Sequence, residues 1–333
     1  MKEEKKGSIT REKKEINKDR RDFLKKSSLF AGAAILTFAT SSYGEPVYEQ
    51  QKRQNKMQTS FSGKRPEYEV YALKYGERIE QSYGTYWMSW PPFTESKPIL
   101  YGYYYWLIKG PDANYLFDTG VAPDHAEYYK IQKYEDPVKM LTRMDLKAED
   151  INAIAISHYH WDHADGLSNF TKNGFKGNIF THKYAFHWLT QIAPKYPEYR
   201  ASDLPNKIDF AVVTNALFDN KAALVPGEHA SAPVEILPGI SVQRMDGHFP
   251  GQIILIVNTG NQPVVLAADA SYMYGNLENG WPVGLLHTTL NDGLDAIHIL
   301  NNHKQNGAVI VPGHDPLVAE RYPEVKKGIY QIA

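Results

Sequence analysis

The sequence of 333 residues contains no cysteine. This absence excludes a disulfide framework, a thiol nucleophile, a thiolate metal site and a bacterial lipid anchor, because each of these needs a cysteine sulfur. A metal site in this chain must therefore be built from histidine and carboxylate side chains. The formal net charge is only −1 at pH 7, so no overall basic field indicates nucleic-acid binding.

Motifs for dinucleotide binding and for crossing a membrane are also missing. No Gly-x-Gly-x-x-Gly motif follows a predicted strand and opens a helix. The apolar run from Leu29 to Ala39 has 11 residues, whereas a membrane-spanning helix needs about 20. The composition, 42% hydrophobic and 23% charged, is typical of a folded globular protein.

The first 44 residues differ from the rest in charge. They carry 11 Lys and Arg against 6 Asp and Glu, whereas the remaining residues carry 26 against 32. The pair Arg20-Arg21 precedes the apolar run, and the small residues Ser42 and Gly44 follow it. A basic region, a short apolar region and small residues are typical of a signal peptide. A basic tail that runs into a buried helix is the alternative.

The N-terminal stretch resembles a bacterial twin-arginine export signal. This resemblance implies a signal peptide over residues 1–44, an interaction with the twin-arginine export machinery, and a periplasmic or secreted mature protein. Residues 45–65 are polar and rich in Gln and Lys, which predicts a linker. We expect one folded catalytic domain over residues 66–333, with no stable membrane anchor.

Hydrophobic patterns in the mature chain predict both strands and helices. Strands are expected at 67–73, 99–108, 114–117, 153–156, 234–245, 253–257, 264–268 and 308–311. Helical spacing occurs at 123–143, 184–192 and 294–302. Hairpins come first, then strand–helix alternation, then strands again. This order favours two sheets covered by helices over a doubly wound parallel sheet.

Four candidate metal ligands lie within six residues after the strand predicted at 153–156: His158, His160, Asp162 and His163. His158 and His160 are two residues apart, so their side chains point to the same side of an extended segment. Four donors at one strand end make two metal ions about 3.5–4 Å apart feasible. Imidazole and carboxylate ligands suit Zn²⁺, with Fe or Mn as alternatives. The competing explanation is a polar turn with satisfied histidines.

The run from His158 to His163 reads H-x-H-x-D-H, which is the motif of the metallo-β-lactamase superfamily, and the sequence resembles a member of it. Three later segments resemble the family's other ligand segments: Gly247-His248-Phe249-Pro250-Gly251, Ala268-Asp269-Ala270 and Val311-Pro312-Gly313-His314. The resemblance implies an α/β fold, the αββα sandwich of two mixed β-sheets flanked by helices.

The same resemblance implies a ligand set for two divalent ions. One ion takes His158, His160 and His248, the other takes Asp162, His163 and His314, and Asp269 bridges them. Asp118, in an Asp-Thr-Gly sequence, matches a family aspartate that supports the site without binding metal. Two divalent cations acidify a shared water, which then becomes a nucleophile near neutral pH.

The segment from Asp269 to Tyr272, Asp-Ala-Ser-Tyr, resembles the N-acyl-homoserine lactonase group of the superfamily. This resemblance implies that the protein opens a lactone ring. Tyr272 is then the catalytic donor to the substrate, and Asp162 is the residue that protonates the leaving oxygen. Gln252 and Phe249 depart from the pattern Gly-His-Thr-Pro-Gly-His of many lactonases, although neither position is a ligand. A packed tyrosine is the alternative role for Tyr272.

Other activities share this ligand set. The main alternative is a glyoxalase-II-like thioesterase, an arylesterase or a phosphotriesterase. Two alternatives from other classes are an iron-dependent oxidoreductase and a non-catalytic binding protein. Asp269 and the absence of cysteine argue against cleavage of β-lactam antibiotics, because the resemblance implies that true β-lactamases of the superfamily have Cys, Ser or another non-bridging residue at this position. We expect a small ester or lactone as substrate and no nucleic acid. The aromatic segment 83–93 has three alternative roles: an acyl-chain pocket, a contact in a homodimer, or plain packing.

Overall fold

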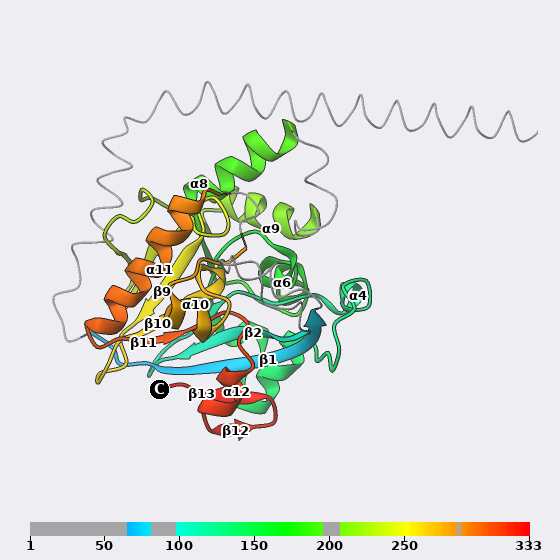
Figure 1. The fold of residues 1–333 in the computed structure, drawn as a ribbon. Coiled ribbons are helices and arrows are strands. Elements are labelled where there is room, and N and C mark those ends of the chain that lie inside the picture. The colour runs from blue at the N-terminus through cyan, green and yellow to red at the C-terminus, as the bar shows by residue number, and fades with distance from the viewer. Residues whose placement is uncertain (1–64, 81–97, 196–206, 285–287) are drawn as a thin grey trace, which may run out of the picture. The chain divides into compact units, whose positions relative to one another are not determined.

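The computed structural model describes residues 65–80, 98–195, 207–284 and 288–333 (Figure 1). The predicted signal peptide, the predicted linker up to residue 64 and the aromatic segment 83–93 lie outside the described residues. Within the described ranges, no helix has both the length and the apolar character needed to cross a membrane.

The larger sheet has eight strands in the order β12-β13-β1-β2-β3-β4-β5-β6. Strands β1, β2 and β3 pair antiparallel, whereas β3, β4, β5 and β6 pair parallel. The sheet is therefore mixed. The strand bounds are β1 (Glu69–Glu80), β2 (Ile99–Lys109), β3 (Asn114–Phe117), β4 (Ile151–Ala155), β5 (Asn178–His182), β6 (Ala222–Val225), β12 (Glu324–Lys326) and β13 (Ile329–Gln331).

The smaller sheet has five strands in the order β11-β10-β9-β8-β7. Strands β10 and β11 pair parallel, and the other neighbours pair antiparallel, so this sheet is mixed as well. The bounds are β7 (Val234–Leu237), β8 (Ile240–Arg244), β9 (Ile253–Val257), β10 (Val264–Leu266) and β11 (Val309–Val311).

Strand β2 shows how the two faces of the larger sheet are buried. Tyr103 and Tyr105 belong to a core cluster that includes residues of the helices, such as Phe170. Trp106, on the other face, belongs to a second cluster that includes Leu255 of the smaller sheet. Side chains alternate between the faces of a strand, so this one strand contributes to both cores.

Helices cover the outer faces of the two sheets. Helix α11 packs on the smaller sheet, where Leu300 shares a core cluster with Ile254 and Val265 (Figure 1). The helix bounds are α4 (Pro123–Ala126), α5 (Pro137–Met140), α6 (Trp161–Ala164), α7 (Leu167–Lys172), α8 (Lys183–His187), α9 (Lys207–Phe218), α10 (Tyr274–Asn279), α11 (Leu290–Gln305) and α12 (Leu317–Arg321). Short turns of other helix types are η1 (Leu141–Met144), η2 (Ala148–Asp150), η3 (Trp188–Ile192), η4 (Ala193–Lys195) and η6 (Ala268–Ala270). The predicted sandwich of two mixed sheets flanked by helices is confirmed.

Two predicted elements are each divided in two in the structure. The helix expected over 123–143 is broken into α4 and α5, because Gln132 forms a β-bridge with Glu77 and Pro137 starts a new helix. Asp136 stays extended before that proline and accepts a hydrogen bond from the amide of Val138. The strand expected over 234–245 is the hairpin β7–β8, with Gly239 in the left-handed conformation at φ 75°.

Candidate metal centre

The first four predicted ligands follow β4 directly. His160 has extended backbone angles, φ −88° and ψ 159°, and is the residue before the first turn of α6. Asp162 and His163 lie in that turn, so their side chains leave the backbone in directions different from those of His158 and His160. The change from strand to helix therefore divides the motif into two pairs of ligands.

The other three predicted ligands come from loops at strand ends of the smaller sheet. His248 lies in the connection between β8 and β9, Asp269 lies in η6 after β10, and His314 follows β11. Strands β10 and β11 are parallel, so their carboxyl ends lie at the same edge of the sheet. This topology brings Asp269 and His314 together although 45 positions separate them in the sequence.

The structure brings all seven side chains together in two groups, which consist of His158, His160, His248 and Asp269, and of Asp162, His163 and His314. Within each group, one ligand atom from every residue lies within 4.8 Å of the others. All seven residues are buried. The histidines and Asp162 divide as the resemblance implied, and Asp269 falls in the first group.

Asp269, a member of the first group, also faces the second group. Its Oδ2 atom lies 3.3 Å from Nε2 of His248 and 3.7 Å from Nε2 of His158. Its Oδ1 atom lies 3.1 Å from Nε2 of His163 and 2.9 Å from Nε2 of His314. Each carboxylate oxygen thus faces one group, which is the arrangement that a bridging ligand requires.

The converging atoms fit cations better than they fit a hydrogen-bonded core. Nε2 of His163, Nε2 of His314 and Oδ1 of Asp269 are buried and make no hydrogen bond of acceptable geometry, despite their short separations. In the other group, Nδ1 of His160 lies 3.0 Å from Nε2 of His158 and 2.7 Å from Nε2 of His248. These two contacts of His160 are within hydrogen-bond distance, whereas the atoms of His163, His314 and Asp269 converge without hydrogen bonds. Buried atoms that converge without hydrogen bonds are typical of ligands around a divalent metal.

Asp118 orients His163 directly and orients His158 through the hydroxyl of Ser157. Nδ1 of His163 donates to Oδ2 of Asp118 over 2.7 Å. The hydroxyl of Ser157 donates to the same oxygen over 2.8 Å and lies 2.9 Å from Nδ1 of His158. These contacts direct the Nε2 atoms of both rings toward Asp269, and such outer hydrogen bonds fix the tautomer and orientation of metal ligands.

Burial and neighbouring charges set the protonation of the cluster. Burial lowers the pKa of His158 well below its ordinary value, and the adjacent imidazoles lower it further. Burial raises the pKa of Asp162. Burial alone would raise the pKa of Asp269 too, but His163 and His314 outweigh it and hold that pKa well below the usual range. Burial alone would lower the pKa of His163, but Asp269, Asp162 and Asp118 outweigh it and hold that pKa well above its ordinary value. The cluster therefore offers a neutral imidazole at His158 and an ionised carboxylate at Asp269, whereas His163 must release a proton to bind a metal.

Tyr272 lies against the first group. Its hydroxyl is 2.9 Å from Nδ1 of His248, and its residue is only 5% exposed. The backbone of Tyr272 accepts a hydrogen bond from the amide of His314 over 3.0 Å, which ties it to the second group. Phe249 is one of the departures from the lactonase pattern. Its ring centroid lies 5.0 Å from that of His160, so it gives this ligand an apolar neighbour.

Sequence reasoning missed the aromatic residues of β2 that border the cluster. The rings of Tyr101 and Tyr103 lie 4.3 Å and 5.6 Å from the ring of His314. Trp161, inside the histidine motif, packs 5.5 Å from Tyr103. The signal in the sequence was the recurrence of tyrosine at every second position of a predicted strand, which places those rings on one face.

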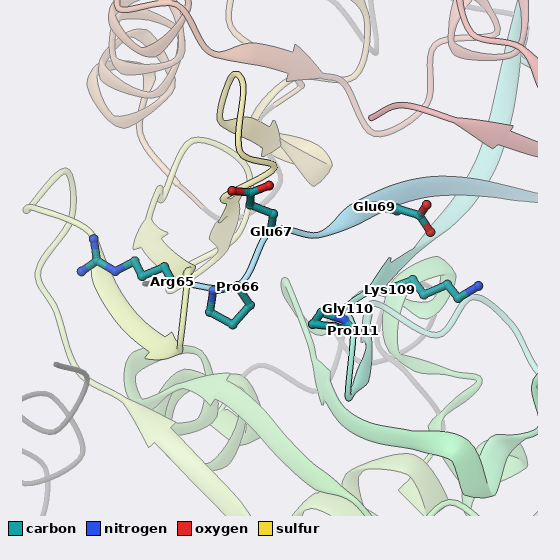
Figure 2. Close-up of a pocket in the computed structure, with 7 residues that line it drawn as sticks. All are labelled: Arg65, Pro66, Glu67, Glu69, Lys109, Gly110 and Pro111. Carbon is teal, nitrogen blue, oxygen red and sulfur yellow. The ribbon is translucent and has the colours of Figure 1, made fainter. Parts of the chain in front are cut away.

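A cavity of about 660 Å³ lies elsewhere, at the start of β1 and the turn between β2 and β3. Figure 2 shows its lining, which consists of Arg65, Pro66, Glu67, Glu69, Lys109, Gly110 and Pro111. None of the seven predicted ligands belongs to this lining. Its side chains carry charges of both signs, so it offers no uniform field for a charged ligand.

Two ligand groups that meet at one carboxylate lie at the edge of a two-sheet sandwich, an arrangement that suits a metal-dependent hydrolase. Residues 100–314 match the family model of the metallo-beta-lactamase superfamily. The chain therefore belongs to that superfamily.

Relatives by sequence carry one shared name. An N-acyl homoserine lactonase of Bacillus sp is 27% identical over 155 residues, which cover 46% of this chain and 52% of that protein. The N-acyl homoserine lactonase AiiB of Rhizobium rhizogenes (strain K84 / ATCC BAA-868) is 25% identical over 229 residues, which cover 63% of this chain and 78% of that protein. The match thus spans about half the length of the first relative.

Solved structures show the same fold. A quorum-quenching N-acyl homoserine lactone lactonase superposes with a TM-score of 0.59 at 19% identity, over 79% of this chain and 98% of the other. AidC, a dizinc quorum-quenching lactonase, superposes with a TM-score of 0.56 at 20% identity, over 81% of this chain and 95% of the other. At these identities the likeness is one of architecture.

Proposed function

We propose that the protein is a hydrolase that opens a lactone ring of the N-acyl-homoserine type. The observation that carries the proposal is the position of Tyr272, whose hydroxyl lies 2.9 Å from Nδ1 of the predicted ligand His248. This tyrosine belongs to the Asp-Ala-Ser-Tyr segment that begins at the bridging Asp269. The names of the relatives, N-acyl homoserine lactonases, support the substrate class.

Two divalent ions, with Zn²⁺ as the first choice and Fe or Mn as alternatives, belong to the proposal. His158, His160 and His248 would hold one ion, Asp162, His163 and His314 would hold the other, and Asp269 would lie between them. When bound, such ions polarise the ester carbonyl and lower the pKa of water.

Tyr272 and Asp162 have separate roles in the reaction, which are hydrogen bonding to the carbonyl oxygen and proton transfer. The Tyr272 hydroxyl donates a hydrogen bond to the carbonyl oxygen, where negative charge develops as water adds to the carbon. The ring C–O bond then breaks, and the leaving oxygen needs a proton. The carboxylate of Asp162 accepts a proton from the water as it adds to the carbonyl carbon and delivers that proton to the leaving oxygen. The product is the open hydroxy acid, and no protein nucleophile is needed.

The described surroundings of the cluster suit an uncharged acyl ester. The side chains that pack around the ligand rings are aromatic: Tyr101, Tyr103, Trp161 and Phe249. Trp161 also stacks on Tyr129, with ring centroids 4.0 Å apart. Aromatic side chains beside the ligands favour an apolar acyl group over a charged one.

A substrate panel on protein of known metal content tests the proposal. N-acyl-homoserine lactones should be hydrolysed with a higher kcat/KM than thioesters, aryl esters or phosphotriesters. Tyr272→Phe should retain its metal and lose about 10–1000-fold in lactone kcat, since one donor to the oxyanion is removed. Unchanged turnover of every lactone by Tyr272→Phe, or a preference for thioesters, would contradict the proposal.

A further inference from the structure

We propose that Tyr101 is a positioning residue, which holds the ring of His314 in its ligand orientation and joins it to Tyr272. The backbone of the neighbouring Gly102 also holds the ring of His314 in this orientation. The inference rests on the proposed metal centre, and its metal-binding test does not depend on the identity of the substrate.

Gly102 and His314 exchange two hydrogen bonds. The amide of Gly102 donates to the carbonyl oxygen of His314 over 2.9 Å. In the opposite direction, Nδ1 of His314 lies 2.9 Å from the carbonyl oxygen of Gly102. A carbonyl oxygen only accepts, so Nδ1 carries the proton and Nε2 keeps its lone pair. That Nε2 atom is the one that lies 2.9 Å from Oδ1 of Asp269.

The ring of Tyr101 covers one face of the His314 imidazole. The two centroids are 4.3 Å apart, and the ring planes differ by 23°. Tyr103 meets the same imidazole edge-on at 5.6 Å and 80°. Rotation of the imidazole away from the metal position would break both contacts as well as the hydrogen bond to Gly102. The β2 segment therefore restricts the ring to the orientation in which Nε2 faces the second group.

Tyr101 also contacts the proposed catalytic tyrosine. The ring of Tyr272 lies 5.6 Å from that of Tyr101 at 71°, and 5.7 Å from that of His314 at 68°. The three rings are thus in mutual contact, and all three residues are at most 5% exposed. Since the Tyr272 hydroxyl reaches His248 of the first group, Tyr101 stabilises a chain of contacts that connects both metal positions.

The sequence of β2 places the tyrosines that meet His314 on one face of the strand. Tyr101, Tyr103 and Tyr105 alternate along the strand and share one face, while position 102 faces the opposite way. A Cβ atom at Gly102 would lie 2.5 Å from the Tyr104 ring, so a side chain there would displace that ring. Tyr105 is a matched control: it is equally buried on the same face, but its ring packs on Phe170 and its hydroxyl donates to the carbonyl of Pro137.

The test compares Tyr101→Leu, Tyr101→Phe and the control Tyr105→Leu in the full chain. Zinc is removed and then titrated back against a chromophoric chelator, which reports the affinity of each position. Tyr101→Leu should weaken one of the two zinc affinities about 10–100-fold, as expected for loss of a group that orients a ligand. Tyr101→Phe keeps the ring and should bind both ions as the native protein does. Tyr105→Leu should lower Tm without changing either affinity.

A second readout separates positioning from general packing. At saturating zinc, Tyr101→Leu should lower kcat for the lactone more than it changes KM, because Tyr272 loses its support. Cobalt(II) in place of zinc should show an altered visible spectrum in Tyr101→Leu and an unaltered one in Tyr105→Leu. If Tyr101→Leu does not fold, Tyr101→Met replaces it in all three measurements.

Three results would overturn the inference: native zinc affinities in Tyr101→Leu, loss of zinc in Tyr101→Phe, or an equal loss of zinc in Tyr105→Leu. A protein that hydrolyses no lactone but shows the expected zinc affinities would contradict the proposed function and leave the role of Tyr101 intact.

Discussion

The hydroxyl of Tyr75 donates a hydrogen bond to the backbone carbonyl of Asp162 over 2.8 Å. Tyr75 is fully buried in β1, 87 positions before Asp162, and its ring packs against those of Tyr103 and Tyr105. The first strand of the larger sheet therefore supports the turn of α6 that carries two predicted ligands. The metal centre depends on this strand, although β1 contributes no ligand.

Removal of this hydroxyl should cost stability without loss of metal. Tyr75→Phe leaves a buried carbonyl without its donor, so the free energy of unfolding should fall by about 1–2 kcal/mol. Chemical denaturation measures this change, and metal analysis should find the native zinc content. Tyr128→Phe, at a position 70% exposed, is the control and should change neither quantity. Equal stabilities of Tyr75→Phe and the native protein would contradict the role of this hydrogen bond.

His160→Ala should lose metal and activity together. The predicted first position loses one of its three histidines, and turnover should drop more than ~100-fold, since even outer partners of ligands account for 10–100-fold. Metal analysis by mass spectrometry and a lactone assay measure the two effects. His298→Ala, on the exposed side of α11, should retain both. A His160→Ala variant with full metal content and native turnover would exclude this residue as a ligand.

The buried carboxyl of Asp209 should make stability depend on pH. Burial raises its pKa to about 7, and Asp165 adds to the shift, while the backbone of Ser168 and the side chain of His125 oppose it. Because the folded state holds this proton more tightly than the unfolded state, the group stabilises the fold fully below pH ~4. That stabilisation is lost as the pH rises toward 7.

Asp209→Asn removes this titration and keeps an oxygen for the hydrogen bond from the amide of Ser168, 2.7 Å in the native protein. Between pH 5 and 8, the variant should therefore gain up to about 2.5 kcal/mol in unfolding free energy relative to the native chain. Denaturation curves across this range measure the gain. The exposed Asp219→Asn should show a flat difference. A flat difference for Asp209→Asn as well would refute the assignment.

We propose that the N-terminal 44 residues direct export through the twin-arginine route to the periplasm or beyond. Arg20→Lys combined with Arg21→Lys keeps the charge but removes the arginine pair, so precursor should accumulate in the cytoplasm. Cell fractionation and immunoblotting measure the distribution. Lys5→Arg with Lys6→Arg, in the same basic region, should leave export unchanged. Normal export of the double lysine variant would defeat this proposal.

The ligand motif was predictable because its information is local. His158 and His160 alternate after a short apolar strand, and a strand end is where a sheet presents side chains to a site. Asp269 and His314 were implied by the resemblance of their segments to the superfamily's motifs, and each follows a short apolar strand of its own. That these side chains bind ions stays a prediction, whereas their convergence is now a structural observation.

The supporting contacts could not be predicted because they join distant segments. Gly102 and His314 are 212 positions apart, and no pattern in either segment indicates that they exchange hydrogen bonds. The break in the helix expected over 123–143 has a similar cause, because Gln132 pairs with Glu77 of β1. Periodicity describes an isolated segment, while these features depend on which segments the fold brings together.

The most direct test of the metal centre is anomalous X-ray diffraction at the zinc absorption edge from crystals of the purified protein. The account predicts two peaks, one among His158, His160 and His248 and one among Asp162, His163 and His314, with Asp269 between them. Diffraction from zinc-supplied crystals with no peak among these residues, or with a peak only elsewhere, would contradict it.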